Sequence, residues 1–143
     1  MPVPVILVQR ASRLPGIPAS RMIARWAHAA LAIDIALTVR VVNGAEGRRL
    51  NSAFRARDHA TNVLTFAYGG APPDADIVLC APVIAREARD QGKTLAAHYA
   101  HLTVHGALHA QGLDHASPRD AKRMEAREIE ILGTLGFRNP YES

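Results

Sequence analysis

Three histidines and one glycine constrain how the middle of this chain can fold. His105 and His109 stand four residues apart in an apolar segment that predicts a helix over residues 95–111. Side chains with that spacing share one face of a helix and lie about 6 Å apart along its axis, so both can reach one ion. His115 can join them if the chain turns back, and Gly112 permits this because glycine readily ends a helix in the left-handed conformation.

Three imidazoles in this pattern are typical of a zinc site that keeps one coordination position for water. A structural zinc site usually has four protein ligands, often thiolates, whereas this chain has a single cysteine, Cys80. We therefore predict that His105, His109 and His115 bind one Zn²⁺ ion, which would lower the pKa of its bound water toward about 7. The alternative is a set of ordinary histidines without a metal, since the chain contains 7 histidines in all.

The spacing of the motif equals that of the metzincin peptidases, but one position differs. Metzincins have a general-base glutamate directly after the first histidine, and this chain has Gly106 there. A glycine side chain cannot accept or return a proton, which argues against peptide hydrolysis by that route. A metallopeptidase with Asp114 as its base is one alternative, although Asp114 can also orient an imidazole or cap the turn after Gly112.

The other apolar patterns predict strands and helices without regular alternation, which is typical of an α+β fold. Strands are expected at residues 3–8, 37–42, 62–68 and 77–80. Helices are expected at residues 20–32, 48–54, 82–91, 95–111 and 117–136. Cys80 should be buried at the end of its strand.

The helix that follows the motif has a clear beginning and a predicted inner face. Ser117 is expected to be its N-cap, with Pro118 in the first turn. Its spacing predicts an inner face made of Met124, Ile129, Leu132 and Leu135. Met124 invites comparison with the metzincin Met-turn, but helical spacing favours a core position. His101 shares a helix face with His105 and is expected to cover the helix surface.

Length, charge and composition are those of one soluble domain. The chain has 143 residues, 48% hydrophobic and 21% charged, and residues 1–143 show no linker or repeat. Its net charge is +4 and arginine far outnumbers lysine, which favours a polyanionic partner, although such an excess also serves solubility. No apolar stretch is long enough for a membrane span, and neither a signal-peptide pattern nor a disulfide pair is found, so we expect a cytoplasmic protein.

Several segments of the chain resemble one bacterial family. The motif His105-Gly-x-Leu-His109-x-x-Gly112-x-Asp114-His115 is similar to the signature of the YbeY family of metal-dependent endoribonucleases. Residues 50–66, the Asp-Ile step at 76–77 and the tail at 124–141 also resemble this family. Ala60, Ala75 and Leu113 depart from its usual pattern, and none of the three is a predicted ligand.

The resemblance implies a fold, a substrate and one further site residue. It implies a four-stranded mixed sheet, zinc on the three histidines of the motif, and a functional arginine at Arg55 in a cleft opposite the metal. By itself, the segment from Arg55 to Asp58 indicates a solvated loop, so the role of Arg55 rests on the resemblance. Asp114 stays a candidate catalytic residue.

The same resemblance implies a cellular role. The family acts on single-stranded RNA in maturation of the 16S rRNA 3′ end and in ribosome quality control, with small ribosomal subunit components as partners. Neither DNA nor a membrane is expected as a partner. A different class of function is also open, in which a zinc-bound assembly factor binds rRNA without cleaving it.

Overall fold

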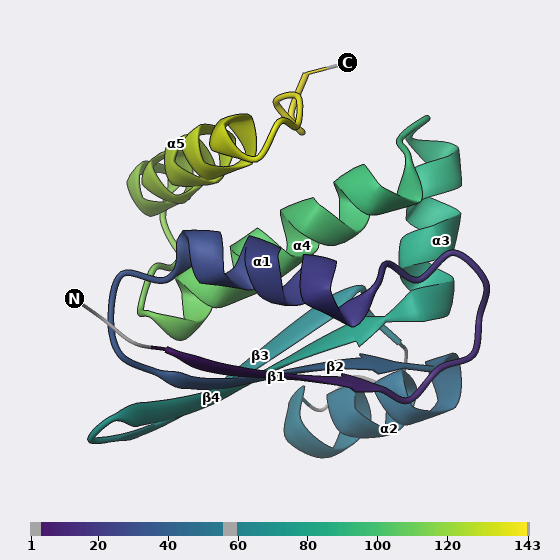
Figure 1. Cartoon of the computed structure of the whole chain (residues 1–143), viewed down its shortest axis with the longest axis horizontal. Coiled ribbons are helices and arrows are strands. Elements are labelled where there is room, and N and C mark those ends of the chain that lie inside the picture. The colour runs from purple at the N-terminus through teal and green to yellow at the C-terminus, as the bar shows by residue number, and fades with distance from the viewer. Residues whose placement is uncertain (1–3, 56–59, 143) are drawn as a thin grey trace.

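The chain folds around a four-stranded sheet with the strand order β1-β2-β4-β3 (Figure 1). The structure is a computed structural model that describes residues 4–55 and 60–142, without the side chain of Arg55. Strands β1 (Val5–Arg10), β2 (Ala36–Val42) and β4 (Pro73–Cys80) are parallel, and β3 (Val63–Gly70) pairs antiparallel with β4. The predicted α+β fold with a mixed four-stranded sheet is therefore confirmed.

The helices of the described residues lie on both faces of this sheet. They are α1 (Ser20–Ala30), α2 (Gly44–Arg55), α3 (Ala81–Asp90), α4 (Leu95–Ala110) and α5 (Pro118–Thr134). Figure 1 shows α1 and α4 together on one face, α2 on the opposite face, and α5 stacked on α4. The N-cap of α5 is Ser117 as predicted, and its Oγ accepts a 3.1 Å hydrogen bond from the Asp120 N–H. Each helix in the described ranges is too short or too polar to pass through a lipid bilayer.

Strand alternation divides the core into two parts. Side chains of the central strands that point toward α1 and α4 are buried, with exposed fractions of 0–1%: Leu37, Val39, Val41, Ile77 and Leu79. A smaller cluster forms on the other face of the sheet, where Leu50 of α2 packs against it: Val42, Leu64, Val78, Cys80 and Val83. The burial of Cys80 confirms the prediction for that residue.

The inner face of α5 differs from the prediction at several positions, since Ile131 is also buried and Leu135 follows the end of the helix and is half-buried. Met124 and Leu132 are buried as predicted, which makes Met124 a core residue. Ile129, however, is half-buried, and Glu128 is the buried residue at this point of the helix, with 1% exposure. Glu128 follows Met124 by four residues, so both share one helix face. The sequence pattern missed it because a carboxylate is rarely buried unless it is paired.

Candidate metal centre

Helix α4 places two of the predicted ligands on one face. The rings of His105 and His109 are parallel within 2°, with 6.5 Å between their centroids. The helix is fixed at its start by Thr94, whose Oγ1 accepts a 3.1 Å hydrogen bond from the Ala97 N–H. The four-residue spacing therefore brings the two rings together, as expected from the sequence.

The turn after α4 brings His115 back to these rings. Gly112 has φ of +99°, and its N–H donates to the carbonyl of His109 at 3.0 Å, as in a helix end of the Schellman type. The ring centroid of His115 lies 5.6 Å from that of His105 and 5.9 Å from that of His109. The predicted role of Gly112 is thus confirmed, because its left-handed backbone reverses the chain at this point.

Hydrogen bonds determine which nitrogen each ring of α4 can offer to an ion. Nδ1 of His105 lies 2.9 Å from Oε2 of Glu128, and Nδ1 of His109 lies 2.9 Å from the carbonyl oxygen of Leu113. Carboxylate and carbonyl oxygens accept hydrogen bonds, so each Nδ1 carries the proton and each Nε2 keeps a lone pair. This donor set fits zinc, which binds neutral imidazole. Leu113 acts through its backbone, so its departure from the family pattern leaves this contact intact.

Asp114 lies beside two of the histidines. One potential ligand atom from each of His109, Asp114 and His115 lies within 4.8 Å of the others. Oδ1 of Asp114 also accepts a 2.7 Å hydrogen bond from the backbone N–H of His115, which is the local turn contact among the alternatives considered. The carboxylate therefore braces the turn and keeps an oxygen beside the rings of His109 and His115.

A buried carboxylate behind these rings was not predicted from the sequence. Besides His105, Glu128 accepts hydrogen bonds from Nε2 of His101 at 2.7 Å and from the Tyr141 hydroxyl at 2.6 Å. Burial by itself would raise the pKa of Glu128, but the three hydrogen bonds outweigh burial and lower the pKa to about 2. The charged carboxylate thus holds the His105 ring. His101, expected to cover the helix surface, belongs instead to this network.

A pocket beside the rings leaves room for a substrate group. It has a volume of about 270 Å³ and is lined by His105, His115 and Tyr141 together with side chains of α5. His115 is exposed and His105 is half-buried, so a ligand that enters from solvent can reach both rings.

Arg55 is the last residue of α2, on the face of the sheet opposite α4 (Figure 1). Its side chain lies outside the described part of the chain, as do residues 56–59, which include Asp58. The role of Arg55 therefore stays a prediction.

Comparison with known proteins identifies the family of this chain. The family described as Endoribonuclease YbeY matches residues 18–136. The Endoribonuclease YbeY of Burkholderia pseudomallei (strain K96243) is 58% identical over 129 residues, which cover 87% of this chain and 70% of that protein. That of Aromatoleum aromaticum is 58% identical over 125 residues, 87% of this chain and 81% of the relative. The chain belongs to the YbeY family.

A solved structure has the same fold as this YbeY family member. The solution structure of TM1509 from Thermotoga maritima matches with a TM-score of 0.58, covering 96% of this chain and all of that one. The two sequences are 21% identical, so this likeness concerns the arrangement of helices and strands.

Gly106 stands where the metzincins have their general base, and in this YbeY family member it faces the sheet. A Cβ atom added at Gly106 would lie 2.9 Å from Cγ2 and 3.1 Å from Cδ1 of Ile77 on β4. These distances are shorter than van der Waals contact, so α4 can approach β4 this closely because residue 106 has no side chain. A glutamate at this position would meet the sheet before it met a metal-bound group.

We expect the Gly106→Ala substitution to destabilise the protein by about 1–3 kcal/mol, the usual cost of overpacking a core. Gly133→Ala is the matched control, because Gly133 is also helical but a Cβ there has no neighbour within 4 Å. The control should gain up to about 1 kcal/mol from the higher helix propensity of alanine. Urea unfolding measures both changes. A Gly106→Ala variant as stable as the control variant would contradict the close packing of α4 on β4.

Proposed function

We propose that this protein is a metal-dependent endoribonuclease that cleaves single-stranded RNA. The observation that carries the proposal is the grouping of His105, His109 and His115 at the end of α4, where the first two rings offer Nε2. The name that the YbeY relatives carry, Endoribonuclease YbeY, supports the endoribonuclease activity. We propose zinc as the metal, because three neutral imidazoles suit it. Residues 1–143 would work as one hydrolase domain.

We propose a separate role for each side chain of the site. The three histidines hold the ion, and zinc, when bound, would polarise the scissile phosphate and lower the pKa of water. Glu128 keeps the His105 ring in its orientation through the 2.9 Å hydrogen bond. Asp114, which is exposed beside His115, would take up a proton during the reaction. Arg55 would neutralise the charge that develops on the phosphate in the transition state.

We further propose ribosomal RNA as the substrate. The role would be maturation of the 16S rRNA 3′ end and ribosome quality control in the cytoplasm, together with small ribosomal subunit components. The net charge of +4, with its excess of arginine, supports an RNA partner because guanidinium groups pair with phosphate. Since such contacts displace counterions, RNA affinity should fall as salt concentration rises.

Two other functions were compatible with the sequence. A metallopeptidase of the metzincin kind is disfavoured by the packing of Gly106 against Ile77, which leaves no room for a glutamate base there. A metallopeptidase with Asp114 as its base would hydrolyse peptides and leave RNA intact. An assembly factor without catalytic activity differs from the proposal in a measurable way, because it would bind rRNA without cleaving it at any zinc concentration.

Replacing Arg55 with alanine is expected to slow cleavage by about 10²–10³-fold, the usual loss when one group that stabilises transition-state charge is removed. The substrate is a single-stranded fragment from the 3′ end of 16S rRNA, and single-turnover rates are compared at saturating protein. Bound metal should be unchanged, since Arg55 is not a proposed ligand. Arg89→Ala, which removes an exposed arginine on α3, is the matched control and should keep the wild-type rate.

Two results of this experiment would count against the proposals. Wild-type cleavage by the Arg55→Ala variant would exclude the proposed role of Arg55. Cleavage by wild-type protein that has been stripped of metal with a chelator would contradict the metal-dependent function itself.

A further inference from the structure

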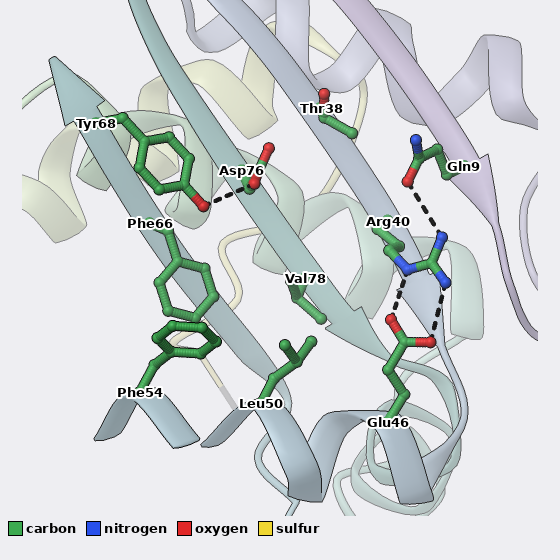
Figure 2. Close-up of a pocket in the computed structure, with 10 residues that line it drawn as sticks. All are labelled: Gln9, Thr38, Arg40, Glu46, Leu50, Phe54, Phe66, Tyr68, Asp76 and Val78. Atoms are coloured by element: carbon green, nitrogen blue, oxygen red, sulfur yellow. Dashed lines mark hydrogen bonds and ion pairs between the residues drawn. The ribbon is translucent and has the colours of Figure 1, made fainter. Parts of the chain in front are cut away.

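A second pocket lies on the face of the sheet that α2 covers (Figure 2), opposite α4 and its histidines (Figure 1). It has a volume of about 340 Å³, which is within the range of small-molecule sites. Thr38, Asp76 and Val78 line it from β2 and β4, and they alternate along the strands with core residues that face α4. Leu50 and Phe54 of α2 close one end.

Aromatic side chains line one side of this pocket. Phe66 and Tyr68 extend from β3, and Phe54 stands against Phe66 edge to face, with ring centroids 5.4 Å apart (Figure 2). Phe54 and Tyr68 are 65% and 63% exposed, although their apolar surface would favour burial. Exposed aromatic rings around a hollow are the usual platform on which an unpaired nucleobase stacks.

A fixed guanidinium group stands on the opposite side of the pocket. Arg40 donates to both carboxylate oxygens of Glu46, at 2.5 and 3.0 Å, and to Oε1 of Gln9 at 3.2 Å. Hydrogen bonding by Arg40 lowers the pKa of Glu46, with a smaller contribution from the nearby charge of Arg49. A planar guanidinium held in this way can stack on one face of a base while an aromatic ring contacts another part of it.

A carboxylate in the pocket provides a preference among bases. The Tyr68 hydroxyl donates a 2.8 Å hydrogen bond to Oδ2 of Asp76, which fixes the carboxylate (Figure 2). A carboxylate accepts several hydrogen bonds at once and donates none. The pairing edge of guanine presents two adjacent N–H donors, whereas adenine presents one amino group beside a ring nitrogen that is itself an acceptor. Asp76 therefore favours guanine over adenine.

We propose that this pocket binds an unpaired guanine base of the RNA, at a site separate from the metal centre. The inference rests on the proposed function, because RNA is the molecule that would supply the base. Arg49 is exposed on α2, and its charge acts on Glu46 of the pocket, so it would contact a flanking phosphate.

Strand β3 connects the pocket with the metal centre. It is an edge strand of the sheet, it carries Phe66 and Tyr68 into the pocket, and α4 packs against its other side. A single strand of RNA that passes around this edge can therefore occupy both sites. The pocket would then contribute to substrate affinity and to the choice of cleavage site, and the metal centre to the chemical step.

Guanosine and adenosine test the pocket directly, since neither carries a phosphate that could bind a metal. We expect zinc-loaded wild-type protein to bind guanosine about 10-fold more tightly than adenosine, as for one good bidentate contact. Amide chemical shifts measured by NMR should change at residues 66–68 and 76–78. Asp76→Asn should remove the preference, because an amide replaces one acceptor by a donor, while Asp74→Asn on the same strand should keep it. Tyr68→Phe keeps the ring but removes the hydrogen bond to Asp76, so it should weaken the preference for guanosine partly.

Cleavage kinetics provide a second measurement. For a single-stranded substrate with one guanine, Asp76→Asn should raise KM about 10-fold while kcat and zinc content stay at wild-type values. Equal affinity for the two nucleosides, or a preference that persists in Asp76→Asn, would overturn the guanine site. Metal-dependent cleavage would stand in either case, so failure of this inference is distinguishable from failure of the proposed function.

Discussion

The His109→Ala variant is expected to lose its bound metal and to cleave RNA more than about 100-fold more slowly than wild type. Loss of a group that merely supports a ligand typically costs 10–100-fold, and loss of a ligand should cost more. His109 is the ring that stacks with His105 and shares a cluster with Asp114 and His115, so its removal breaks the ligand set at its centre. Metal content after dialysis and single-turnover cleavage of a single-stranded rRNA fragment measure the two losses.

The matched control for this variant is His28→Ala, which removes an exposed histidine on α1. It should keep both metal and activity. The metal-free forms of wild type and His109→Ala should unfold at similar temperatures, because the partly exposed His109 ring contributes little to the core. Normal cleavage by His109→Ala would contradict the metal-dependent mechanism.

The second large effect is expected at Glu128. Glu128→Ala leaves three hydrogen-bond donors without their acceptor, each costing about 1–3 kcal/mol where the group is buried, so we expect a loss of stability of about 3 kcal/mol or more. Zinc affinity should fall about 10–100-fold, because His105 loses the carboxylate that orients its ring. Urea unfolding and competition with a zinc chelator measure the two effects separately.

Glu128→Gln distinguishes positioning of the ligand from support of the fold. The amide keeps the volume of the side chain and one acceptor oxygen, so much of the stability should return. Its NH₂ group cannot accept a hydrogen bond, and a neutral oxygen is a weaker acceptor, so zinc affinity should stay about 10-fold below wild type. Glu130→Ala, at an exposed carboxylate on the same helix, is the control. Wild-type zinc affinity in both Glu128 variants would show that this residue only supports packing.

Much of the metal centre was predictable because its geometry is local. His105 and His109 share a face of α4 through helical spacing alone, and Gly112 reverses the chain through its own backbone freedom. The same reasoning located the strands and helices, although α2 begins at Gly44, four residues before its predicted start. Asp114 was identified as a candidate, and its turn contact was among its expected roles.

The contacts that support the centre were decided by the tertiary structure. His105 and Glu128 lie 23 residues apart in the chain, and they meet because α5 packs on α4. Periodicity located the inner face of α5 but favoured Ile129 over Glu128. Burial of a charge is favourable only where partners compensate for it, and the sequence does not show which residues those partners are. In the sequence, Gly106 is notable because it replaces the general base of the metzincins. The structure shows that Ile77 leaves no space for a side chain at this position.

By itself, the sequence determined the proposed ligands, the turn that gathers them and the α+β class, because helix and strand periods act over a few residues. Tertiary structure decided which side chains hold those ligands and where a second pocket forms. Both depend on which elements pack together, and that is set by the burial of the whole apolar surface rather than by any single segment.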